Sequence, residues 1–250
     1  MANSREQDII RAFVDLSNEL VEGYDLVDLL SDLTANCARL LDVASAGLLL
    51  ADGTGVLHLA AASSDRTHHL EVFQLQREEG PCLDCFHGGE PVIVPDLSEE
   101  THRWPQFVGT ATEVGFASVH ALPMRLRHTV LGTLGLFGDR PGRLSDDDLS
   151  LAQAMVHVAS VALVNEKSAS DLTTVNTQLQ HALVSRVALE QAKGVLAHVG
   201  GLDMQDAFNV LRRYARDNGL KLSDVARQIV ARELPGETLI DHAKAVSILS

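Results

Sequence analysis

Two groups of side chains in the 250-residue sequence have types and spacings that could carry chemistry. The first is a single C-x-x-C, Cys82 and Cys85, and the Pro81 before it suits the first turn of a short helix. The helix dipole would favour a thiolate there, which is compatible with redox sensing or metal binding. A structural zinc site needs four ligands, and His87 offers only a third nearby. We therefore interpret the two cysteines as thiols that line a pocket or pack beneath a loop, and we expect no metal and no cofactor.

The second group is a cluster of basic residues near the C-terminus. Its members are Arg186, Lys193, Arg212, Arg213, Arg216 and Lys221. Arg212 and Arg216 are four residues apart, so on a helix they share a face and reinforce each other's potential where a polyanion could neutralise them. The alternative is a solvated basic face that binds nothing.

The charge of the chain is unevenly distributed. The formal net charge is −14, yet the stretch from Asn176 to Glu233 holds eight Lys and Arg against six Asp and Glu, which is +2. The remainder holds twelve against twenty-eight, which is −16. With 46% apolar and 22% charged residues the chain is neither disordered nor fibrous. We therefore expect two globular modules, one acidic and one mildly basic.

The cellular setting is inferred from features that the sequence lacks. No apolar run approaches the length of a membrane span, and Met1 to Asp8 lacks the basic-then-apolar order of a secretion signal. Three cysteines are too few for a disulfide framework. We expect a cytoplasmic protein that keeps its thiols reduced and does not contact a membrane.

The elements that must position the cysteines form an α+β pattern. Apolar residues at helical spacing predict two helices before residue 42, and two hairpins and a short strand come after them. The expected strands are Ala46–Ala51, Val56–Ser63, a segment within Pro91–Pro95, Ser118–Met124 and Val130–Phe137. Thr67–Arg77 and the stretch from Trp104 to Val114 read as helices between the hairpins. The order predicts an antiparallel sheet flanked by helices.

A long connecting helix is predicted over residues 145–196. Ten positions, eight of them apolar, are separated alternately by four and three residues: Leu151, Met155, Val158, Ala162, Asn165, Ala169, Leu172, Asn176, Leu179 and Leu183. Such a heptad seam predicts a parallel coiled coil, in which Asn176 at an a position would select a two-stranded pairing. The alternative is that the same residues pack within one chain.

The basic residues belong to a predicted three-helix bundle over residues 176–233. Gly200 and Gly201 end the long helix, Asp203 can cap the second helix, and Leu222 to Ile229 gives a short third one. Residues 234–250 are expected to be a tail or a short helix.

The first module resembles a GAF domain. The resemblance is carried by the order of elements and by three segments: Gly80–Cys85 (GPCLDC), Glu90–Asp96 (EPVIVPD) and Ser118–Gly138 (SVHALPMRLRHTVLGTLGLFG). It covers about residues 5–165, and the predicted GAF-like domain is residues 1–165. It implies a sensor fold whose pocket, between the sheet and the helix-rich middle, holds an unidentified small-molecule effector.

The second module resembles an ANTAR domain, the output module of transcription antitermination regulators. Three blocks occur in order, Ser185–Gly194 (SRVALEQAKG), Ala207–Asp217 (AFNVLRRYARD) and Lys221–Ala226 (KLSDVA). The resemblance implies binding of tandem RNA stem-loops in a leader transcript by a dimer. The implied RNA-binding residues are Arg186, Gln191, Lys193, Arg212, Arg213, Arg216 and Lys221. Gln191 is the candidate for hydrogen bonding to base edges, and Tyr214 is expected to pack partly in the core.

We therefore expect an RNA-binding antitermination regulator that is not an enzyme and acts as a homodimer. Two alternatives remain open. One is a GAF signalling module that acts through a protein partner without binding nucleic acid. The other is a thiol enzyme that uses Cys82 and Cys85.

Overall fold

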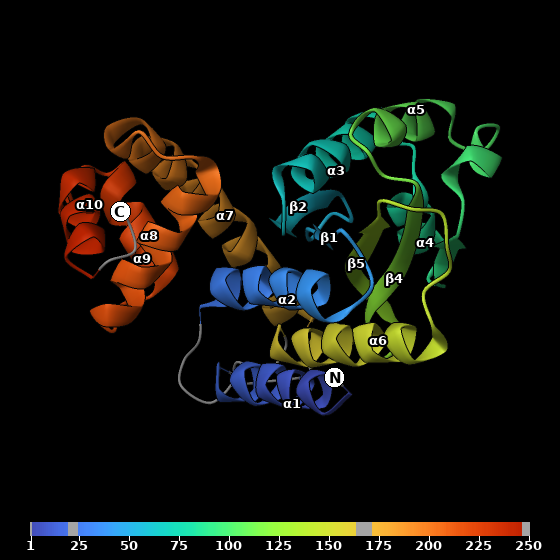
Figure 1. The fold of residues 1–250 in the computed structure, drawn as a ribbon, viewed down its shortest axis with the longest axis horizontal. Helices are drawn as coiled ribbons and strands as arrows, with labels where there is room; N and C mark the ends of the chain where they lie inside the picture. The colour runs from blue at the N-terminus through green and yellow to red at the C-terminus, as the bar shows by residue number, and fades with distance from the viewer. Residues whose placement is uncertain (1, 20–24, 164–171, 247–250) are drawn as a thin grey trace. The chain divides into compact units, whose positions relative to one another are not determined.

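The computed structural model shown in Figure 1 describes residues 2–19, 25–163 and 172–246. The chain divides into two compact units. The first comprises Met1–Gly23 and Leu29–Gln180, and the second comprises Tyr24–Asp28 and His181–Ser250. Within the described residues, no helix combines the length and apolar character that crossing a bilayer requires.

The first unit has the predicted α+β order. Its helices are α1 (Ala2–Glu19), α2 (Leu26–Leu40, whose first residues belong to the second unit), α3 (Asp65–Arg77), α4 (Pro81–Gly88), the 3-10 helix η1 (Leu97–Glu100), α5 (Pro105–Glu113) and α6 (Asp146–Ala162). Its strands are β1 (Ser45–Ala51), β2 (Leu57–Ala62), β3 (Val92–Val94), β4 (Ser118–Leu126) and β5 (Thr129–Gly138). All five predicted strands are confirmed.

The five strands form one antiparallel sheet in the order β2-β1-β5-β4-β3. The β1–β2 hairpin closes on Asp52, whose carboxylate accepts hydrogen bonds from the Thr54 and Val56 N–H groups (2.8 and 3.1 Å). Such a side-chain-to-backbone turn is what the Asp-Gly-Thr-Gly sequence predicts. β5 lies at the centre of the sheet between β1 and β4, and all of β1 and the residues of β5 from Leu131 onward are buried.

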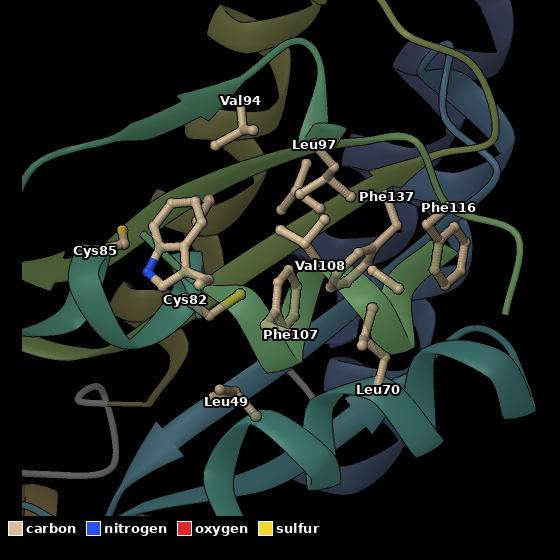
Figure 2. Packing of buried hydrophobic residues seen from close by; sticks show 14 of the residues in the cluster. Leu49, Leu70, Cys82, Cys85, Val94, Leu97, Phe107, Val108, Phe116 and Phe137 are labelled. Carbon is tan, nitrogen blue, oxygen red and sulfur yellow. The ribbon is translucent and has the colours of Figure 1, made fainter. Parts of the chain in front are cut away.

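The two faces of the sheet carry different helices. Figure 1 shows α3, α4 and α5 on one side, and α6 packs against β4 on the other. Because side chains alternate along a strand, Leu49, Val119 and Phe137 point to the first face. There they join the buried cluster of Figure 2 with Leu70 from α3 and Phe107 from α5. This cluster is the core of the sensor fold.

The predicted connecting helix is described in two pieces. α6 ends at Ala162, with Leu163 as its C-cap, and α7 (Leu172–Gly200) comes next. Residues 164–171, which include Asn165 and Ala169 of the seam, lie outside the described part, as do the side chains of Leu172, Asn176 and Leu179. Met155 and Ala162 are fully buried within the chain. The expectation that these two residues face a second chain was wrong, because the apolar face of α6 packs on the sheet.

The second unit contains the end of α7, α8 (Met204–Asp217), α9 (Leu222–Val230) and α10 (Gly236–Ala245). Asp203 caps α8 as predicted, since its Oδ1 accepts a hydrogen bond from the Asp206 N–H (2.7 Å). Gly219 comes after α8 with φ +63°, in the left-handed region. The three helices expected between residues 176 and 233 are therefore all present.

A fourth helix occupies most of the segment predicted as a tail or a short helix. α10 packs against α8, and its Leu239, Ile240 and Ala243 are buried in the core of the unit. Gly200 allows this approach, because a Cβ there would lie 2.7 Å from the Ile240 Cδ1. Residues 236–245 are thus part of the bundle.

Candidate functional site

Cys82 and Cys85 lie on α4, with Pro81 in its first turn as predicted. Both side chains are fully buried beneath the sheet (Figure 2). Burial raises the pKa of the Cys82 thiol well above its usual range and that of Cys85 to about 12. Desolvation thus outweighs any effect of the helix dipole, and both thiols are neutral. The geometry favours the interpretation of packed thiols over that of a redox pair.

The partner of Cys82 is a residue that the sequence analysis did not select. The Cys82 thiol donates to Glu71 Oε1 (3.7 Å between Sγ and oxygen), and the Gln74 amide donates to Glu71 Oε2. Glu71 is fully buried on α3. Burial raises the pKa of Glu71 to about 8, although the hydrogen bonds from Gln74 and Cys82 oppose the shift. The Glu71 carboxyl is therefore mostly protonated at neutral pH.

Two glycines on the central strands make room for this carboxyl. Gly47 of β1 and Gly135 of β5 are direct partners across the sheet. A Cβ at Gly47 would lie 2.7 Å from Glu71 Oε1, and one at Gly135 would lie 2.9 Å from both Glu71 Oε1 and Cys82 Sγ. Contacts this short do not occur for real Cβ atoms, so neither position tolerates a side chain while Glu71 is in place. Glu71 and Cys82 therefore lie between the sheet and the helices, where the GAF resemblance places a ligand.

A signal for Glu71 was present in the sequence. The buried residues of α3 are Thr67, Leu70, Glu71 and Gln74, at the spacing i, i+3, i+4 and i+7 that marks one helix face. Three of the four are polar, so a search for apolar residues at this spacing finds only a weak helix. Polar residues on the inward face of a helix predict a buried polar cluster.

A pocket of about 200 Å³ lies elsewhere in the first unit, lined by residues of β4 and of the loop after β5. His120 of β4 lines this pocket, and it points away from the cluster of Figure 2 because Val119 and Ala121 point into it. The Leu144 N–H donates to His120 Nε2 (3.1 Å). Burial lowers the pKa of His120 to about 4, with a smaller contribution from Arg143. The neutral imidazole therefore anchors the loop at physiological pH.

The basic residues of α8 lie on its exposed face. The buried residues of the helix are Ala207, Val210, Leu211 and Ala215. Arg213 and Arg216 are exposed on the opposite side, where a 100° rotation per residue also places Arg212. Arg213 Nε forms an ion pair with Asp217 Oδ2 on the same helix (2.8 Å). Of the three predicted arginines of this helix, Arg213 and Arg216 are thus on its outer surface.

Arg212 is less accessible than its neighbours. Its Nε lies 2.8 Å from Asp28 Oδ1, and each of the two side chains is 20% exposed. Both residues belong to the second unit, which includes Tyr24–Asp28. The Arg212 guanidinium is therefore engaged within the protein.

Arg186 of α7 corrects the predicted set. It is only 8% exposed, and its Nη2 lies 2.7 Å from Glu190 Oε1. Burial lowers the pKa of Arg186, and the Glu190 carboxylate opposes the shift. Arg186 was expected on the surface. It is buried instead, and the Glu190 carboxylate compensates its charge, because a buried charge needs a partner. Arg186 is therefore part of the buried interior of the second unit.

The other predicted residues differ in exposure. Lys193 shares Glu190 with Arg186 (3.1 Å between Nζ and Oε2), and its Nζ lies 6.0 Å from the centre of the Phe208 ring. Gln191 and Lys221 are exposed, and Lys221 stands at the N-cap position of α9. Tyr214 is half-buried against the core as predicted, with its ring edge-on to His242.

Among the described residues, no group of three or more His, Cys, Asp or Glu side chains is placed to hold a metal ion.

Comparison with solved structures shows what this fold resembles. The chain matches the GAF domain of a phosphoenolpyruvate-protein phosphotransferase from Acinetobacter with a TM-score of 0.53 and 17% identity, over 69% of this chain and 99% of that one. A GAF domain of the same type of enzyme from Coxiella burnetii gives 0.48 and 12%, over 63% and 93%. A free methionine-R-sulfoxide reductase from Neisseria meningitidis, solved with its substrate, gives 0.49 and 13%, over 71% and 91%. At 17% identity, the likeness to the Acinetobacter domain shows the fold alone.

Family comparison then gives the class. The GAF domain family matches residues 24–164, more than half of the chain, and the chain belongs to that family. Residues 177–230 match the ANTAR domain, so the architecture is GAF followed by ANTAR. This is the architecture of a regulator that joins a sensor domain to an RNA-binding antitermination domain. The comparison with curated proteins returned no match.

Proposed function

We propose that the protein binds tandem stem-loops in leader transcripts as a homodimer and so promotes antitermination. The observation that carries the proposal is the exposed face of α8, where Arg213 and Arg216 lie inside the segment that matches the ANTAR domain. In a chain with a net charge of −14, a local basic face is where a polyanion is attracted. Lys221, at the start of α9, extends it.

The residues of this surface have distinct proposed roles. Arg213, Arg216 and Lys221 neutralise phosphates, and the exposed Gln191 hydrogen-bonds to base edges in the loops. Stem-loops suit such residues because their unpaired bases are splayed out, whereas the deep groove of an RNA helix does not admit side chains. We leave Arg186 out of the interface because it is buried and paired.

The proposed dimer uses the exposed side of α7. Leu183, the last position of the predicted seam, is half-buried, but Val184 and Val187 are large apolar residues exposed to solvent. They are three residues apart and share a face of α7. Pairing two chains through this face would bring two RNA-binding surfaces into one particle, so that the second stem-loop binds at a high effective concentration.

The sensor domain is proposed to respond to a small molecule that enters between the sheet and the helices α3, α4 and α5. Glu71 and Cys82 lie there beside a packed hydrophobic core, so a ligand that binds in this space displaces side chains. Thiol catalysis is not proposed, because neutral and fully buried thiols are poor nucleophiles.

Gel-shift titration tests the RNA proposal. A two-stem-loop RNA should bind more tightly than duplex DNA of equal charge, and removing one stem-loop should weaken binding. Arg216→Ala should lower the magnitude of the slope of log K against log salt by about 0.7, the value for one lost phosphate contact. Equal binding of RNA and duplex DNA, with a slope that Arg216→Ala leaves unchanged, would remove this surface from the mechanism. Binding to a protein partner alone would favour the signalling alternative.

A further inference from the structure

A short acidic segment from near the start of the chain is part of the second unit. Its described residues are Asp25–Asp28. Val27 is 2% exposed and lies in the same buried cluster as Leu211 of α8 and Val225 of α9. Burial of an aliphatic side chain anchors the segment independently of charge.

Asp25 fixes the segment at the start of α9. Its Oδ2 accepts a hydrogen bond from the Ser223 N–H in the first turn of that helix. Its Oδ1 accepts one from the Val27 N–H (3.0 Å). α9 has no hydrogen bond from its own N-cap side chain at Lys221, so the Asp25 carboxylate supplies an acceptor where the helix leaves N–H groups open.

Asp28 forms an ion pair with Arg212, one of the predicted RNA-binding residues. The 2.8 Å separation between Asp28 Oδ1 and Arg212 Nε puts a carboxylate where an RNA phosphate would have to lie to pair with the same atom. Both side chains are 20% exposed. The two paired atoms, Arg212 Nε and Asp28 Oδ1, are themselves buried, so RNA reaches this guanidinium only when the carboxylate moves away. Arg213 differs, because its Asp217 partner lies on α8 itself.

We propose that the segment Asp25–Asp28 competes with RNA for Arg212 and keeps this side chain from binding RNA. This inference rests on the proposed function. RNA phosphate and the Asp28 carboxylate exclude each other at this guanidinium, so the seated segment lowers the affinity of the surface. Asp28 and Leu29 are consecutive residues of α2, and the boundary between the two units falls between them. The chain thus gives the sensor a covalent connection to the competitor.

The test measures how tightly the full-length protein binds a two-stem-loop RNA at several salt concentrations. Asp28→Asn removes the charge and keeps the size of the side chain. We expect binding to tighten by about fivefold, the effect of one such ion pair, and the salt slope to steepen by about 0.7 as Arg212 gains a phosphate. Asp28→Glu, which keeps the charge, should retain the wild-type affinity.

Two controls separate this effect from general electrostatics. Asp147→Asn removes the same charge from an exposed position in the first turn of α6, and it should change the affinity far less than Asp28→Asn. In an Arg212→Ala background, Asp28→Asn should have no effect, because the residue it releases is gone. Thermal unfolding of each variant establishes that it is folded.

The outcomes are distinguishable. If wild type and Asp28→Asn bind the RNA equally well, the competitor is overturned and the proposed function stands. If Asp28→Asn tightens binding equally with and without Arg212, the competitor is also overturned. If neither wild type nor any variant binds the RNA at low salt, the proposed function fails, and this inference fails with it.

Discussion

The Glu71 carboxyl shows how much a single residue depends on its surroundings. It is fully buried, with two donors and two facing glycines around it. An acid in such a place is stable only when it is neutral. Its ionisation would oppose the packing of α3 on the sheet.

This argument predicts a pH dependence of stability. The pKa of Glu71 is about 8 in the folded protein against an ordinary 4.5. Between these values the unfolded chain releases the proton and the folded chain keeps it, so the contribution of Glu71 to stability falls as pH rises from 4.5 to 8. Glu71→Gln should remove this loss. The free energy of unfolding of the variant, relative to wild type, should therefore rise by a few kcal/mol, to order of magnitude, from about pH 5 to pH 8.

Urea unfolding of the first unit at several pH values measures that difference. Glu78→Gln is the matched control, because Glu78 is exposed just after the same helix. A wild-type minus variant difference that stays constant across this pH range would show that Glu71 is not held neutral.

Two arginines of the predicted set should respond differently to substitution. Arg186→Ala removes a buried partner of Glu190 and should destabilise the second unit by about 1–3 kcal/mol, with RNA affinity unchanged at temperatures where the variant is folded. Arg213→Ala, on the exposed face, should weaken RNA binding and change stability by less than about 0.5 kcal/mol. Thermal melts and gel shifts on the same samples check both. The reverse assignment would show that the buried residue is the one that reaches RNA.

At the level of residues, the sequence indicated which residues carry charge better than it indicated which of them are buried. The apolar stripe of α8 defines the opposite face of the helix, and Arg213 and Arg216 are exposed there. The sequence predicted Arg186 to be exposed with them, because basic residues are usually exposed. In the structure Arg186 is buried and pairs with Glu190, one helical turn away. The sequence analysis missed Glu71, because a carboxylate is not expected inside.

At the level of elements, the predictions succeeded where a local signal exists. The strands are predicted by alternating apolar residues and by turns rich in glycine and aspartate. For residues 234–250 the sequence analysis left a tail and a short helix as alternatives, because the ANTAR resemblance ends before this segment. The spacing of Leu239, Ile240 and Ala243 nevertheless marks an apolar helix face, and Pro235 suits its start.

α10 should contribute measurably to the stability of the second unit. Leu239 is fully buried, so Leu239→Ala should destabilise the unit by about 2–5 kcal/mol. Thr238→Ala, at the neighbouring exposed position, is the control. Hydrogen exchange of the α8 amides reports this unit separately from the sensor domain, and equal protection in both variants would contradict a structural role for α10.

At the level of the whole molecule, the proposal depends on two chains acting together. Light scattering should give a dimer mass at micromolar concentration. Val184→Glu with Val187→Glu should give the monomer mass, because the charges would face each other across the proposed seam. The dimer should lose its preference for two stem-loops over one when it dissociates. A wild-type monomer mass at every concentration would refute the pairing.

The apolar side of α10 also decides how the RNA-binding segment behaves when it is produced without this helix. A fragment cut at Val230, where the family match ends, would leave Leu196, Val210 and their neighbours without the cover of Leu239 and Ile240. Bare aliphatic surface of this kind associates with any similar surface. Such a fragment should self-associate and precipitate when it is concentrated, whereas a fragment that extends to Val246 should remain in solution.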